Sequence, residues 1–176
     1  MFVKIEDLTP KKIINFYLPH KLELATESLV VNKSEQIANI LLKNIFSITG
    51  ITRILLTSQL LSVSYDGAVK DDVRAYILAE LDDFFVEGFS SSVSDISNVT
   101  LIEQAESLAD ALIRPTLNRD KGDIEILSLK DGVLKLKFLG HCAGCPYAQN
   151  TLQNVIAKTL LRYLPQISEI TLEECQ

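Results

Sequence analysis

The stretch GHCAGCP at residues 140–146 contains two of the three cysteines of the 176-residue chain, Cys142 and Cys145. It follows residues 133–139, in which apolar side chains alternate with the period of a β-strand. Pro146 fits the first position of a helix, where its missing N–H removes no intrahelical bond. The pattern predicts a strand, a cysteine loop and a helix in succession, with the cysteines at the helix N-terminus.

A C-x-x-C pair at a helix N-terminus favours thiolates, because the helix dipole and the unpaired N–H groups there stabilise negative charge. Two neighbouring thiolates either carry out redox chemistry or bind a metal, and a purely structural loop is the third possibility. They supply half of the four ligands that zinc or an iron–sulfur cluster usually takes. If Cys142 and Cys145 bind a metal, the remaining ligands must come from elsewhere.

The surroundings of the pair favour a metal or a cluster over a redox dithiol. Gly140 and Gly144 lack Cβ atoms, so the backbone can curve closely around a bound anion. A thioredoxin-type motif normally lies in an early βαβ unit, whereas this pair follows a predicted hairpin. His141 adjoins Cys142, and next-door residues seldom bind one centre together. Cys175 lies beside carboxylates, which disfavour a thiolate, and we expect it to be incidental.

The charges and the apolar pattern predict neither a nucleic-acid partner nor a membrane. Lys and Arg number 17 against 23 Asp and Glu, which gives a net charge of −6, and the basic residues form no cluster. No apolar run approaches the roughly 18 residues of a membrane-spanning helix.

The sequence predicts a soluble protein of a reducing compartment, which we expect to be a cytoplasm of the bacterial type. Residues 1–7 are mixed and acidic, unlike a secretory signal or an Arg- and Ser-rich transit peptide. The odd number of cysteines, three, also argues against a disulfide framework.

A Ser-rich segment at residues 88–98 predicts a linker between two small α+β domains, residues 1–87 and 99–176. For the first domain we expect an antiparallel sheet with two helices. Ser34 is the expected N-cap of the first helix, and a stripe from Val73 to Phe84 marks the second. The expected strands cover residues 13–18, 29–31, 51–57 and 60–65.

The second domain is predicted to have the order α-β-β-α-β. Asn98 or Thr100 caps its first helix, and Pro115 ends or kinks that helix. Asp131-Gly132 predicts a two-residue hairpin between strands at 124–129 and 133–139. A helix that ends at Pro165 and a strand ending near residue 172 follow.

The second half of the chain carries an ordered set of motifs: Arg114-Pro115, Asp120-Lys121-Gly122-Asp123, Asp131-Gly132, the cysteine stretch at 140–146 and Leu164-Pro165. With these motifs, residues 99–174 resemble the C-terminal domain of NifU, the Nfu-type iron–sulfur domain. Residues 1–87 contain Thr9-Pro10, Phe16-Tyr17-Leu18-Pro19 and Ile48-Thr49-Gly50-Ile51, and they resemble, more weakly, the N-terminal domain of Nfu-type scaffold proteins. The family usually has Asp-Gly-Gly-Asp where this chain has Asp120-Lys121-Gly122-Asp123. Lys121 therefore either restricts that loop or replaces a glycine that tolerates substitution.

The resemblance implies a scaffold or carrier, not an enzyme, that receives an iron–sulfur cluster and passes it to apo-proteins. In such proteins two protomers bridge one cluster, usually [4Fe–4S] rather than [2Fe–2S], and each gives one C-x-x-C. Cys142 and Cys145 would be the cluster ligands. The implied partners are apo iron–sulfur recipients, the upstream cluster assembly machinery and a second copy of the chain in a metal-dependent homodimer.

Two alternatives from other classes use the same cysteine pair. One is a thiol–disulfide oxidoreductase that works without metal. The other is a zinc-bridged dimer with a protein-interaction role. Zinc is colourless whereas a cluster absorbs visible light, so a spectrum separates these alternatives.

Overall fold

The structure, a computed structural model, describes residues 3–34, 36–67, 72–86, 92–93, 97–143, 147, 150 and 152–173. The chain divides into two compact units, Met1–Val99 and Thr100–Gln176. Both units combine helices with a sheet, so the predicted α+β class is confirmed.

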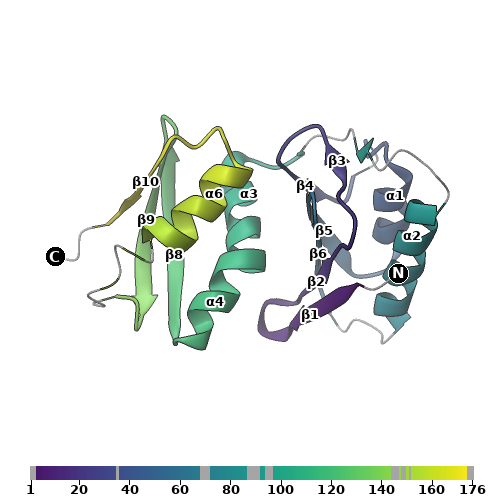
Figure 1. Cartoon of the computed structure of the whole chain (residues 1–176), viewed down its shortest axis with the longest axis horizontal. Coiled ribbons are helices and arrows are strands. Elements are labelled where there is room, and N and C mark those ends of the chain that lie inside the picture. Colours follow the sequence, from purple (N-terminus) through teal and green to yellow (C-terminus); the bar gives the residue numbers. More distant parts are fainter. Residues whose placement is uncertain are drawn as a thin grey trace. The chain divides into compact units, whose positions relative to one another are not determined.

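The N-terminal unit is built on a five-stranded antiparallel sheet (Figure 1). In spatial order its strands are β1 (Lys4–Leu8), β2 (Ile13–Tyr17), β6 (Leu60–Tyr65), β5 (Ile51–Thr57) and β4 (Ser28–Asn32). The β5–β6 hairpin has the bounds that the sequence predicts. Strand β1 was not predicted. It is an edge strand of mostly polar sequence that pairs with β2 alone in this sheet.

Two helices, α1 (Ile40–Ser47) and α2 (Asp72–Val86), cover one face of this sheet (Figure 1). Helix α1 begins later than predicted, because Asn39 rather than Ser34 is its N-cap: Asn39 Oδ1 accepts a hydrogen bond from the Leu42 N–H at 3.3 Å. Alternate residues of the strands and the inner stripes of both helices form one core. Its fully buried members include Phe16, Leu29, Leu41, Leu42, Ile45, Ile54, Leu56, Leu61, Ile77 and Leu81.

The described part of the predicted linker, residues 88–98, is bound to the N-terminal unit. Strand β7 (Ser92–Val93) pairs in parallel with β3 (Glu23–Leu24). The Ser97 hydroxyl accepts a hydrogen bond from the Val30 N–H at 3.0 Å. The division into residues 1–87, 88–98 and 99–176 stays a prediction.

The C-terminal unit has the predicted order α-β-β-α-β (Figure 1). Its sheet has the order β10-β9-β8, in which β8 and β9 are antiparallel and β10 runs parallel to β9. Helices cover one face of the sheet. The elements are α3 (Leu101–Leu108), a π-helical turn (Ala109–Ile113), α4 (Arg114–Arg119), β8 (Gly122–Lys130), β9 (Val133–Gly140), a second π-helical segment (Leu152–Ala157), α6 (Lys158–Tyr163) and β10 (Glu169–Leu172).

The β8–β9 turn has the backbone that the sequence predicts. Asp131 and Gly132 have φ angles of 51° and 79°, the left-handed values that a two-residue hairpin of type I′ requires at both central positions. The turn sets the register of the pairs nearest to it, and an irregularity between Ile126 and Ser128 then shifts the register by one residue. Gly122, the first residue of β8, consequently pairs with Gly140, the last residue of β9.

Pro115 does not end the first helix of this unit. The helix continues to Arg119, and the π-helical turn Ala109–Ile113 lies directly before the proline. The Arg114 N–H bonds to the Ala109 carbonyl, five residues back. This wider turn accommodates Pro115, whose nitrogen cannot donate to the helix ladder.

The N-cap of α3 is Thr100, one of the two residues that the sequence allows. Its hydroxyl accepts a bond from the Glu103 N–H at 3.4 Å, and Glu103 Oε2 accepts one from the Thr100 N–H at 2.9 Å. We expect Thr100→Ala to lower the free energy of unfolding of this unit by about 1 kcal/mol, since it leaves the Glu103 N–H without the side-chain oxygen that accepts it.

Urea unfolding followed by hydrogen exchange in β8 and β9 measures this loss. The control is Thr116→Ala on the exposed side of α4, which we expect to leave the free energy of unfolding unchanged or slightly raised, because alanine favours helix more than threonine does. Equal effects of the two variants would contradict the capping role of Thr100.

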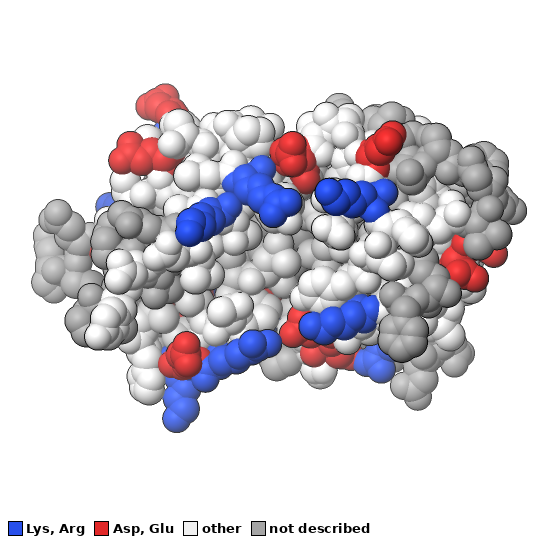
Figure 2. All heavy atoms as spheres, viewed as in Figure 1, with Lys and Arg blue, Asp and Glu red and all other residues white. Residues whose placement is uncertain are grey.

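In the part of the chain that the structure describes, no helix is long and apolar enough to cross a membrane. On the face drawn in Figure 2, Lys and Arg side chains lie among Asp and Glu side chains and form no patch of one sign.

Candidate functional site

Cys142 lies in a turn directly after strand β9. The Ala143 N–H donates to the Gly140 carbonyl at 3.1 Å and closes the turn. Gly140 has a φ of 61°, a left-handed conformation that favours glycine. Cys142 is half-buried. The fold therefore holds this residue in place while part of it stays within reach of solvent.

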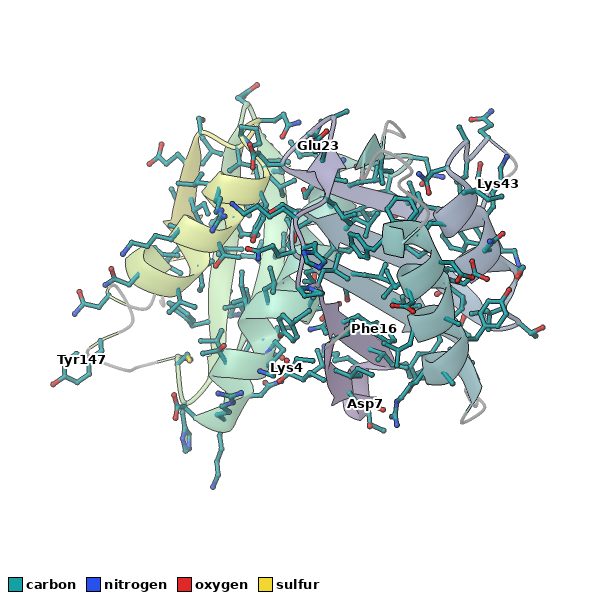
Figure 3. The ribbon with its side chains drawn as sticks, turned by 45° about the vertical axis from the view of Figure 1, so that its right-hand side comes forward. Lys4, Asp7, Phe16, Glu23, Lys43 and Tyr147 are labelled. Carbon is teal, nitrogen blue, oxygen red and sulfur yellow. The ribbon has the colours of Figure 1, made fainter. Side chains whose placement is uncertain are left out.

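The other predicted ligand, Cys145, lies outside the described residues, as do Gly144, Pro146 and Cys175. Among the described residues, no group of three or more His, Cys, Asp and Glu side chains is arranged to hold a metal ion. His141 is exposed, and its N–H donates to the Lys121 carbonyl at 3.1 Å. Tyr147 is 68% exposed and points away from the ribbon (Figure 3).

The start of β8 lies against Cys142. A Cβ atom added to Gly122 would lie 2.1 Å from the sulfur of Cys142. Gly140, which pairs with Gly122 across the two strands, is equally close to its neighbours: a Cβ there would lie 2.4 Å from the Lys121 carbonyl oxygen. The sequence motif Asp120-x-Gly122-Asp123 is thus part of the cysteine site, although sequence reasoning did not identify Gly122 as a site residue.

Lys121 has a φ of 55°, so this chain places a lysine in a left-handed conformation where the Nfu-type motif has glycine. The Lys121 N–H donates to the Asn118 carbonyl at 3.0 Å, and the Lys121 carbonyl accepts from His141. These two bonds hold the loop in the left-handed form, which costs about 1–2 kcal/mol for a residue with a Cβ atom.

We expect Lys121→Gly to raise the free energy of unfolding of the C-terminal unit by about 0.5–1 kcal/mol. Glycine removes the left-handed strain but adds freedom to the unfolded chain, which offsets part of the gain. The control is Lys137→Gly in β9, which we expect to lose about 1 kcal/mol because a strand interior disfavours glycine. Urea unfolding compares the two variants, and a loss in both would refute the strain at Lys121.

Arg114 is a buried guanidinium, 7% exposed, that joins the first helix of this unit to β8. Its Nη1 donates to Glu106 Oε2 and to Asp110 Oδ1, both at 2.8 Å. Its Nε donates to Asp123 Oδ1 at 3.2 Å, and its Nη2 to the Ile124 carbonyl at 3.0 Å. The planar fork of arginine suits these several acceptors. Arg114 thereby fixes the two residues that follow Gly122.

Burial by itself lowers the pKa of Arg114, but the hydrogen bond to Glu106 and the charges of Asp110 and Glu106 outweigh it, and the net pKa is raised. A raised folded-state pKa contributes stability that is fully present below the unfolded-state pKa of arginine and is lost only as the pH rises past the folded-state pKa. The Arg114 guanidinium is therefore fully charged at neutral pH.

A family model for the NifU-like domain matches residues 106–171. The C-terminal unit therefore contains a NifU-like domain, which confirms the resemblance that the motifs indicated. The match covers Arg114, Gly122 and both cysteines of the C-x-x-C pair.

Sequence similarity to known proteins extends beyond residues 106–171. The chain is 28% identical over 141 residues to the NFU1 iron-sulfur cluster scaffold homolog, mitochondrial, of Drosophila persimilis, with 74% of this chain and 50% of the relative covered. It is 25% identical over 185 residues to the human protein of the same name, with 97% and 71% covered. The chain thus spans about half the length of the Drosophila relative.

One solved structure, of a NifU-like protein from Saccharomyces cerevisiae, aligns with a TM-score of 0.45 and 17% identity, and covers 56% of this chain and 87% of that one.

The relatives correct the predicted location. Both the Drosophila and the human protein are named mitochondrial. The prediction of a cytoplasmic protein is therefore wrong by this comparison. That prediction rested on the composition of residues 1–7, and the composition of so short a segment does not show in which compartment related proteins occur.

Proposed function

We propose that this chain is an iron–sulfur cluster scaffold and carrier, not an enzyme, that holds a cluster through Cys142 and Cys145. The observation that carries the proposal is the thiol of Cys142, half-buried in the turn after β9 of a NifU-like domain. Relatives along most of the chain are named iron-sulfur cluster scaffolds, which supports the same role.

The number of ligands implies a second copy of the chain. A cluster takes four thiolates, and one C-x-x-C supplies two. Two protomers that each give Cys142 and Cys145 complete the set, with [4Fe–4S] favoured over [2Fe–2S]. Because the bound cluster bridges the chains, its binding energy becomes association energy, and the homodimer depends on metal.

The partial exposure of Cys142 suits transfer. A recipient apo-protein must bring its own thiolates to the iron before the carrier's thiolates leave. A sulfur that the fold orients but does not enclose allows that exchange. The proposed partners are therefore apo iron–sulfur proteins on one side and the cluster assembly machinery that loads the site on the other.

Anaerobic reconstitution of the full chain with iron and sulfide tests the proposal. We expect broad visible absorbance, about two irons per chain for a shared [4Fe–4S] cluster, and a dimer that dissociates when the cluster is removed. A colourless dimer that retains zinc would replace the proposal with the zinc-bridged alternative. Metal-free protein that reduces insulin disulfides in a Cys142-dependent manner would replace it with the oxidoreductase.

A further inference from the structure

Gly122 lies directly beside the side chain of Cys142. A Cβ on Gly122 would lie 2.1 Å from the Cys142 sulfur, 3.3 Å from its Cβ and 3.5 Å from its backbone nitrogen. Real Cβ atoms do not approach other atoms to 2.1 Å, so the sulfur occupies the space that any side chain at position 122 would need.

The backbone of Gly122 does not itself require glycine. Its φ lies outside the left-handed region, unlike that of Gly132 or Gly140. An alanine at position 122 would therefore meet no conformational penalty of its own. The contact with Cys142 is the reason that the structure supplies for a glycine at this position.

The strand around Gly122 is held so that it cannot move away. Arg114 binds the Asp123 carboxylate at 3.2 Å and the Ile124 carbonyl at 3.0 Å, and so fixes the two residues that follow. On the other side, the Lys121 carbonyl accepts the His141 N–H at 3.1 Å. When a methyl group is added at position 122, the Cys142 sulfur must give way, because it lies at the end of a single rotatable bond.

We propose that Gly122 is a positioning residue for cluster binding: its missing side chain forms the seat that fixes the rotamer of Cys142. The meaning of this seat for the cluster rests on the proposed function. The seat itself is a property of the metal-free chain, so it is tested there first.

The first test measures the reactivity of Cys142 in the full metal-free chain that carries Cys145→Ser and Cys175→Ser, so that Cys142 is its single thiol. We expect Gly122→Ala to raise the rate of alkylation by iodoacetamide at least threefold, because the displaced sulfur becomes more exposed. Ser128→Ala, a change of one atom farther along β8, is the control and should leave the rate unchanged. Equal rates for Gly122→Ala and its parent would overturn the proposal.

A double-mutant cycle covers the case in which Gly122→Ala perturbs folding. Gly122→Ala is expected to raise the equilibrium constant of unfolding in both backgrounds. We expect the factor of increase to be at least threefold larger when residue 142 is cysteine than in the Cys142→Ala chain, which lacks the sulfur. Failure to fold with Cys142 but not with Cys142→Ala supports the seat. An equal loss in both backgrounds would show that position 122 needs glycine for another reason, and would overturn it.

The third measurement links the seat to the cluster. In the full chain with all cysteines, we expect Gly122→Ala to lose a reconstituted cluster at least fivefold faster than the parent, with a shifted visible spectrum. If the parent binds no cluster, the proposed function fails, while alkylation and the cycle still decide whether Gly122 orients Cys142. If the parent binds one and Gly122→Ala releases it at the parental rate, the positioning role is refuted.

Discussion

Reconstituted Cys142→Ser is expected to retain less than about one-tenth of the iron bound by the unchanged chain. Loss of even an outer-shell partner of a metal ligand typically costs about 10- to 100-fold in affinity. Loss of a ligand itself costs at least as much, because a serine hydroxyl stays protonated at neutral pH and does not replace a soft thiolate. Cys145→Ser should lose iron to the same extent, since both cysteines of each chain are needed to make four ligands.

Iron and sulfide analysis after gel filtration measures the retained cluster, and sedimentation shows whether each variant still dimerises. Cys175→Ser is the matched control, because it removes a thiol outside the C-x-x-C pair. Full iron and sulfide in both Cys142→Ser and Cys145→Ser would exclude the pair as the cluster site. Loss of iron in Cys175→Ser as well would show that the ligand set is larger than the pair.

We expect Arg114→Ala to lower the free energy of unfolding of the C-terminal unit by about 3 kcal/mol. Breaking a buried ion pair typically costs 3–5 kcal/mol. We take the lower end because Glu106, Asp110 and Asp123 are 28–37% exposed and water screens part of the charge. The variant leaves these carboxylates without their shared cation and the Ile124 carbonyl without the Arg114 donor.

Hydrogen exchange of the β8 and β9 amides in urea measures this loss in the unit that contains Arg114. Arg119→Ala, an exposed change near the end of α4, is the control and should cost less than about 0.5 kcal/mol. Arg114→Lys should fall between them, because an ammonium cannot reach all the acceptors of a planar fork. If Arg114→Ala lowers the free energy of unfolding by less than about 1 kcal/mol, the ion pairs and hydrogen bonds of Arg114 contribute little to the stability of this unit.

Elements with a strong local signal were predictable from sequence. The β5–β6 hairpin and the Asp131-Gly132 turn came out as predicted because their residues specify the backbone locally. Strand β1 was missed because its sequence is mostly polar and its pairing with β2 is a tertiary interaction. The start of α1 was misplaced because Ser34 and Asn39 are both good caps, and sequence alone does not rank them.

The cysteine chemistry of the site was predictable from sequence, but the residues that hold the site in place were not. Cys142 is visible in the sequence because thiolate chemistry needs a particular residue type at a particular spacing. Gly122 and Arg114 act through contacts that form when β8 pairs with β9 and lies beside the first helix of its unit. In the sequence, Gly122 and Arg114 were recognised only as parts of family motifs. The fold shows which residues each of them contacts.

The π-helical turn Ala109–Ile113 has a consequence for chain length. Such a turn accommodates one extra residue and leaves the helix on either side in the same rotational phase. Deleting a residue there would restore a regular α-helix without rotating Thr100 away from the start of α3 or Arg114 away from Asp123. A regular helix, however, has no room for the ring of Pro115. Shortening this helix by one residue and replacing Pro115 are therefore changes that we expect to occur together in related sequences.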